Sequence, residues 1–107
     1  MNNLNKDILL GTAIGDALGV PVEFEYRQEL EKNPVIGMRE YGTHNQPKGT
    51  WSDDSSLALC LAESLCNGYN LNDIADKFIR WYYDGYCTPY GRVFDIGITT
   101  ARAISNL

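Results

Sequence analysis

The stretch that decides the fold is Trp51–Ala62, whose sequence is WSDDSSLALCLA. Two adjacent aspartates, Asp53 and Asp54, stand between serines, and an apolar run follows at once. Serine and aspartate are preferred at helix N-termini, because their side-chain oxygens accept hydrogen bonds from backbone N–H groups and a negative charge suits the helix dipole there. The stretch predicts a helix over about Asp54–Cys66, apolar on nearly every face and therefore buried.

The start of this helix also gathers hard oxygen donors. Hydroxyl and carboxylate groups occupy all four positions of Ser52–Ser55. That composition suits Mg²⁺ or a similar hard cation. Helix capping is nevertheless the commoner use of these residue types, and taken alone the motif favours capping over a metal site. A second motif upstream reverses that preference.

The second motif is Gly11–Glu23, with the sequence GTAIGDALGVPVE. Its glycines recur every fourth residue, so on a helix they form a bare stripe that another backbone can approach closely. Asp16 lies near the helix C-terminus, where the dipole disfavours a carboxylate. Pro21 ends the helix, so Glu23 falls on extended backbone from which its side chain can reach into a cleft. The alternative for Glu23 is a solvated loop acid.

In this order and spacing, the two motifs resemble the ADP-ribosylglycohydrolase family, which includes the dinitrogenase-reductase-activating glycohydrolases. Gly11–Glu23 is similar to the family's first helix and the acidic loop after it. Gly49–Ser55 is similar to its Thr-Asp-Asp-Thr metal motif, with serine in both threonine positions. The segments around Phe78 and Phe94–Thr100 are similar to later parts of the family sequence. The resemblance extends from about Asp7 onward and implies an N-terminal portion.

The resemblance implies a hydrolase that removes ADP-ribose from modified protein side chains or small molecules. It implies a pair of divalent ions, Mg²⁺ or Mn²⁺, with Ser52, Asp53 and Asp54 as metal ligands. It also implies that Glu23 is the catalytic acid or base, and that Asp16 orients the metal-binding residues without touching metal. These ions would orient the sugar and activate a water molecule. No substrate-binding residue is predicted.

The resemblance also implies what the chain lacks. The family has a second metal cluster, an Asp-x-Asp-Thr/Ser motif, and after Asp76 the only acidic residues are Asp84 and Asp95. We therefore expect at most partial metal binding and no activity from the isolated chain. Two alternatives stay open: a degenerate binding domain of the same family without catalysis, and an unrelated small helical interaction module whose aspartates only cap a helix.

The remaining sequence predicts an all-α fold: a single, partial domain over residues 1–107, with about four helices and one long functional loop. A loop as long as 25–52 is uncommon in a compact domain and is usually functional. Ile74, Phe78, Trp81 and Tyr82 recur at helical spacing, which predicts an amphipathic helix capped by Asn70 or Asn72 and ended by Gly85. The other expected helices cover about 5–19 and begin at about 95, with a short helical turn near 27–32.

Composition narrows the partners. The chain has 107 residues and a formal net charge of −5, and its basic residues are scattered, which argues against nucleic acid. No apolar run is long enough to span a bilayer, and the N-terminus does not resemble a signal peptide. Three cysteines without zinc-type spacing fit reduced, buried thiols in the cytoplasm. Because the helix after Asp54 needs neighbours on all sides, we expect a homo-oligomer or a complementing C-terminal chain.

For two further features, a histidine and an aromatic cluster, we expect structural rather than functional roles. His44, the only histidine, lies in the long loop without an acid at a telling spacing, and we expect a solvated side chain rather than a catalytic base. The aromatic residues between 81 and 90 could stack on an adenine ring, but at helical spacing such residues more often belong to a core.

Overall fold

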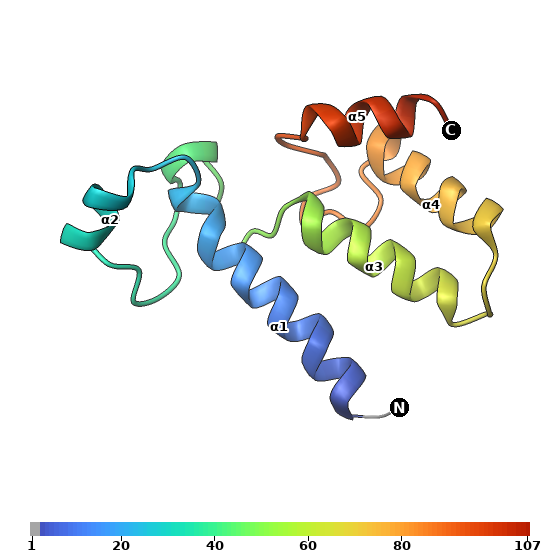
Figure 1. Ribbon diagram of the computed structural model, residues 1–107, viewed down its shortest axis with the longest axis horizontal. Coiled ribbons are helices and arrows are strands. Elements are labelled where there is room, and N and C mark those ends of the chain that lie inside the picture. The colour runs from blue at the N-terminus through green and yellow to red at the C-terminus, as the bar shows by residue number, and fades with distance from the viewer. Residues whose placement is uncertain (1–2) are drawn as a thin grey trace. The chain divides into compact units, whose positions relative to one another are not determined.

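The computed structural model describes residues 3–107, and within this range the chain is helical, without a strand (Figure 1). This confirms the predicted all-α class. The elements in chain order are α1 (Asn3–Gly19), the 3₁₀ turn η1 (Val20–Val22), α2 (Arg27–Lys32), the 3₁₀ turn η2 (Gly42–His44), α3 (Asp53–Leu65), α4 (Leu71–Asp84) and α5 (Ile98–Ser105). The predicted helical turn near 27–32 is a complete short helix, α2.

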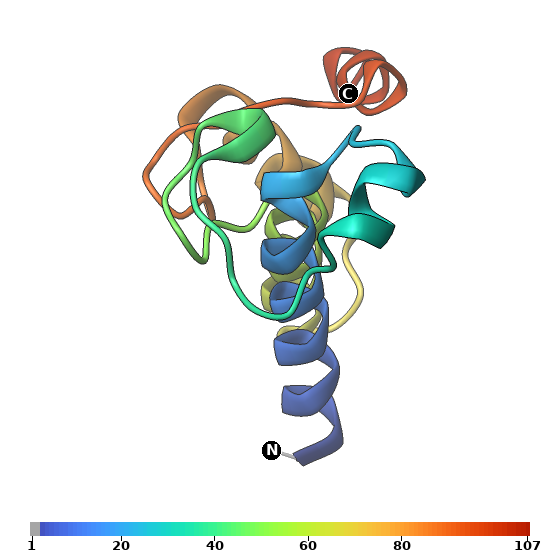
Figure 2. The same cartoon turned by 90° about the vertical axis from the view of Figure 1, so that its left-hand side faces the viewer.

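The chain divides into two compact units, one ending at Trp51 and the other spanning Ser52–Leu107. The first unit holds α1, η1, α2 and η2, and the second holds α3, α4 and α5. The ribbon in Figure 2 follows the same elements from a second direction. That both units belong to one domain stays a prediction.

In the first unit, α1 ends where the sequence predicts. Its last residue is Gly19, and the chain passes through η1, which contains the buried Pro21. Proline lacks the N–H that an α-helix needs and restricts the residue before it. Glu23 follows η1 with φ −55° and ψ 138°, an extended conformation as expected. Within this unit, no atom lies within 4 Å of a Cβ built at Gly11, so the expected close approach of another backbone is not found there.

In the second unit, the core is formed by Cys60, Trp81 and Ile104, which α3, α4 and α5 contribute in turn. Helix α4 packs against both α3 and α5. The side chain of Asn70 caps α4 by accepting a hydrogen bond from the Asp73 backbone N–H, at 3.1 Å. Gly85 ends the helix at φ +74°, where a Cβ would overlap the Gly91 carbonyl. The predicted amphipathic helix and its ends are confirmed, with Asn70 rather than Asn72 as the cap.

Two predictions for this unit are wrong. Helix α3 is not buried on all sides, because Leu61 and Leu65 are 38% and 46% exposed while three serines of the helix are buried. The last helix begins at Ile98 instead of about Asp95. Asp95 has φ +48°, outside the helical region, so the helix cannot start there.

A polar network joins α3 to α4 beside the core. The buried Ser64 hydroxyl donates a hydrogen bond of 2.5 Å to Asp73 Oδ2, and the Lys77 ammonium group donates to both Asp73 oxygens at 3.1 and 3.2 Å. These hydrogen bonds, first from Ser64 and then from Lys77, lower the pKa of Asp73 below its ordinary value of 3.8. Lys77 also lies 3.7 Å from Glu63, which accepts a hydrogen bond from the Tyr86 hydroxyl.

None of the three cysteines forms a disulfide, and they differ in burial. Cys60 is fully buried, Cys87 is partly exposed and Cys66 is exposed. Burial is the largest cause that raises the pKa of the Cys60 thiol to about 12. The prediction of buried thiols therefore holds for Cys60 alone.

Two isoleucines of α5 provide a matched test of the core. Ile104 is 4% exposed and Ile98 is 72% exposed. We expect Ile104→Ala to lower the free energy of unfolding by about 2–5 kcal/mol, since it leaves a cavity. Ile98→Ala should change it by less than about 0.5 kcal/mol. Urea unfolding followed by circular dichroism measures both, and equal effects would mean that Ile104 is not part of the core.

The Asp73 network predicts a pH dependence of stability. A carboxyl group whose pKa is lowered by folding stabilises the folded state above its unfolded pKa, and this contribution is lost as the pH falls through the folded value. Asp73→Asn should therefore be less stable than the parent at neutral pH, and the difference should shrink below the ordinary value of 3.8. Asp76→Asn, at an exposed position of the same helix, is the control. A difference that persists unchanged into acid would contradict the assignment.

Candidate functional site

The predicted metal ligands Ser52, Asp53 and Asp54 lie together at the start of α3. Ser52 is the N-cap residue, with φ −107° and ψ −161°, but its side chain makes no capping hydrogen bond. Asp53 and Asp54 are the first two helical residues, and Asp53 Oδ1 accepts a hydrogen bond of 3.1 Å from the Asp54 backbone N–H.

The next two serines fix this helix start in the unit. Ser55 and Ser56 are buried at 2% and 1% exposure, and the Ser56 hydroxyl donates a hydrogen bond of 2.9 Å to the Cys87 carbonyl. Asp53 is partly exposed and Asp54 is exposed. One hydroxyl and two carboxylates therefore stand at an anchored helix start, and an all-oxygen donor set of this kind fits Mg²⁺ or Mn²⁺.

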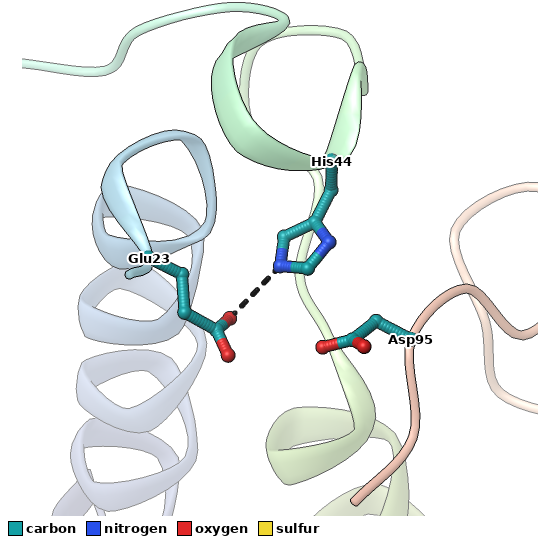
Figure 3. A group of neighbouring side chains, drawn as sticks. All are labelled: Glu23, His44 and Asp95. Atoms are coloured by element: carbon teal, nitrogen blue, oxygen red, sulfur yellow. Dashed lines mark hydrogen bonds and ion pairs between the residues drawn. The ribbon is translucent and has the colours of Figure 1, made fainter. Parts of the chain in front are cut away.

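Glu23, the predicted catalytic residue, is paired with His44 in the first unit (Figure 3). His44 Nε2 lies 3.1 Å from Glu23 Oε2, and Figure 3 shows this interaction as a dashed line. The Glu23 side chain is 41% exposed and the His44 side chain is 11% exposed. Glu23 is therefore accessible to solvent while one of its oxygens is held by a largely buried imidazole.

The prediction of a solvated His44 is wrong. Its ring lies edge-on to Phe24, with centroids 6.1 Å apart, in addition to its contact with Glu23. The two partners are 21 residues apart in the sequence, and η2, with its flanking turn, brings them together. A spacing of this length carries no local signal, so the sequence could not indicate the pair.

The other predicted features differ in their burial. Asp16 is partly buried in the second half of α1, and its orienting role stays a prediction. Trp81 is 1% exposed and belongs to the core, as expected for aromatic residues at helical spacing. Tyr83 and Tyr90 are 66% and 57% exposed. Within residues 3–107, no helix combines the length and apolar character that crossing a bilayer requires.

Comparison with known proteins identifies the class to which this helical chain and its acidic motifs belong. The model of the ADP-ribosylglycohydrolase family matches residues 5–107. The chain belongs to this family, which confirms the resemblance noted in the sequence.

Individual relatives are consistent with this assignment. The chain is 44% identical over 102 residues to the ADP-ribosylarginine hydrolase Tri1 of Serratia proteamaculans (strain 568), covering 92% of this chain and 27% of the relative. It is 39% identical over 101 residues to the protein of the same name from Pseudomonas putida (strain GB-1), covering 92% and 26%. It is 32% identical over 106 residues to the ADP-ribosyl-[dinitrogen reductase] glycohydrolase of Rhodospirillum rubrum, covering 89% and 31%. The chain thus spans about a quarter to a third of the length of these relatives.

Proposed function

We propose that this chain forms the N-terminal part of a metal-dependent ADP-ribosylglycohydrolase that releases ADP-ribose from modified arginine. Family membership supports the hydrolase class, and two relatives named as ADP-ribosylarginine hydrolases favour arginine as the modified residue. The observation that carries the proposal is the oxygen-rich start of α3, where Ser52, Asp53 and Asp54 stand in succession and Asp54 is exposed.

In this proposal, Ser52, Asp53 and Asp54 hold Mg²⁺ or Mn²⁺ through oxygen atoms. A bound divalent ion polarises sugar oxygens and lowers the pKa of a water molecule. The protein supplies a rigid base for these donors, because Ser56 ties the first turn of α3 to the Cys87 carbonyl. Asp16 would act from α1 as an orienting residue.

In this proposal, Glu23 acts as the general acid or base. Cleavage of the bond between the ribose anomeric carbon and the arginine nitrogen needs a proton removed from water and a proton given to the leaving group. Carboxylates perform both tasks in glycoside hydrolysis. The solvent-accessible carboxylate of Glu23 suits this role, because a substrate can reach it while His44 holds one oxygen.

The chain alone supplies only part of such a site. Each unit also exposes large apolar side chains: Leu4, Ile8, Leu10 and Ile14 on α1, and Leu61 and Leu65 on α3. We propose that a second copy or a complementing C-terminal chain covers these faces. The same partner would bring the remaining metal ligands that the family resemblance implies.

The metal proposal predicts weak, specific binding. These ions prefer six oxygen ligands, and two carboxylates and one hydroxyl supply only part of that set. Water must supply the rest, so we expect a dissociation constant for Mn²⁺ of about 10⁻³ M or weaker. Asp53→Ala combined with Asp54→Ala should abolish binding in a titration followed by electron paramagnetic resonance. Asp84→Ala, at an exposed position of α4, is the control and should leave binding unchanged. Tight binding that survives the double substitution would place the metal elsewhere.

The catalytic proposal predicts that activity depends on the rest of the enzyme. The isolated chain should release no ADP-ribose from ADP-ribosylated arginine, because the sugar and water are not fully held. A chimera in which residues 5–107 replace the matched segment of the Serratia relative should hydrolyse that substrate. In this chimera Glu23→Gln should reduce turnover by about 10²-fold or more. Glu25→Gln, at an exposed neighbouring position, is the control.

An inactive chimera that folds and binds ADP-ribose would favour the alternative of a non-catalytic binding domain. Full activity of the Glu23→Gln chimera would remove Glu23 from the reaction. Hydrolysis by the isolated chain would show that these 107 residues complete an active site among themselves or with a second copy.

A further inference from the structure

The turn that carries His44 is closed on itself by backbone hydrogen bonds. The Tyr41 N–H donates to the Gln46 carbonyl at 2.6 Å, and the Asn45 N–H donates to the Gly42 carbonyl at 3.2 Å. Tyr41, Gly42 and Asn45 have φ values of +63°, +58° and +53°. Asparagine adopts such values readily, but for a residue such as Tyr41 they are uncommon and need support from the surrounding structure. The turn therefore presents His44 from a defined backbone.

The same turn is attached to the segment that carries Glu23. The Thr43 hydroxyl donates a hydrogen bond of 2.7 Å to the Glu23 backbone carbonyl. Gly42 lies so close to Pro21 that a Cβ at Gly42 would overlap the Pro21 carbonyl. The backbones of Glu23 and His44 are thus fixed relative to each other by contacts that do not involve their side chains.

The backbone of His44 is held by a third hydrogen bond. The amide of Gln46, a residue only 7% exposed, donates a hydrogen bond of 3.1 Å to the His44 carbonyl. An ionised carboxylate can only accept hydrogen bonds, so the pairing requires the His44 tautomer that has its hydrogen on Nε2, from which the ring donates a hydrogen bond to Glu23 Oε2. The donor reaches one carboxylate oxygen, and Oε1 takes no part in the bond.

We propose that His44 is a positioning residue for Glu23: it holds Oε2 and thereby aims Oε1 at the proton that is transferred in the reaction. The inference rests on the proposed function, because it assigns His44 a role through Glu23. A glutamate side chain loses considerable rotational freedom when it is fixed, and a partner that fixes it before substrate binds removes that cost from the reaction. A displacement of about 1 Å at a reacting group can cost about 10²-fold in rate.

The pairing itself is tested on the 107-residue chain by NMR, without any activity measurement. His44 is the only histidine, so its two ring nitrogens give a single set of signals in a long-range ¹H–¹⁵N correlation spectrum. We expect Nε2 to be protonated, with its hydrogen protected from exchange with water. Glu23→Ala should remove that protection, and Glu25→Ala should not. A ring that exchanges freely in the parent chain would overturn the pairing.

The positioning role is tested in the chimera with the Serratia relative. We expect His44→Ala to lower kcat by about 10- to 100-fold while KM stays close to that of the parent chimera. His44→Gln, whose side-chain amide can donate from a similar position, should restore most of kcat. Lys48→Ala, at an exposed position of the same loop, is the control. Rescue by glutamine distinguishes positioning from a general loss of structure.

A backbone variant gives an independent check. Gly42→Ala changes the chemistry of neither side chain, but its Cβ would overlap the Pro21 carbonyl and displace the turn that carries His44, so it should lower kcat as His44→Ala does. If Glu23→Gln abolishes activity and His44→Ala has no effect, the positioning role is wrong and the proposed function stands. If Glu23→Gln has no effect, both the role of Glu23 and the positioning role are overturned, whatever the NMR result.

Discussion

Proline at position 21 cannot donate a backbone hydrogen bond and restricts the conformation of Val20, so α1 cannot continue unbroken beyond Gly19. The chain turns through η1, and Glu23 leaves it on extended backbone. The Pro21 carbonyl is also the surface on which Gly42 packs, and one residue further along Thr43 bonds to the Glu23 carbonyl. The end of a single helix thus determines where the loop closes and where Glu23 meets His44.

The second unit places acidic side chains at the start of a helix that is anchored in a core. The buried face of α3 carries hydroxyl groups as well as Cys60, and each buried serine needs a partner. The Ser64 hydroxyl donates a hydrogen bond to Asp73, and the Ser56 hydroxyl donates one to the Cys87 carbonyl. These bonds fix both ends of α3. They leave the carboxylates of Asp53 and Asp54 partly or fully exposed.

The chain corresponds to only part of its family relatives. The chain belongs to the ADP-ribosylglycohydrolases but covers 26–31% of the relatives named above. Exposed apolar side chains on α1 and α3 are consistent with surfaces that pack against additional chain. The two units carry the carboxylate of Glu23 and the oxygen donors of α3. In the proposed function, further metal ligands come from additional chain.

The sequence by itself determined the helical class and the family. It also determined the end of α1 at Pro21 and the ends of α4 at Asn70 and Gly85, because caps and helix-breaking residues act on adjacent backbone. The sequence did not reveal that α3 buries serines, because their burial depends on packing. It also did not reveal that Asp95 lies outside the last helix, because this depends on a positive φ at that residue. Only the tertiary structure decided that His44 meets Glu23. Tyr41 and Asn45 adopt positive φ in a turn closed by local backbone hydrogen bonds. The contacts of Thr43 and His44 with Glu23 join residues distant in the sequence, which no local pattern of side chains encodes.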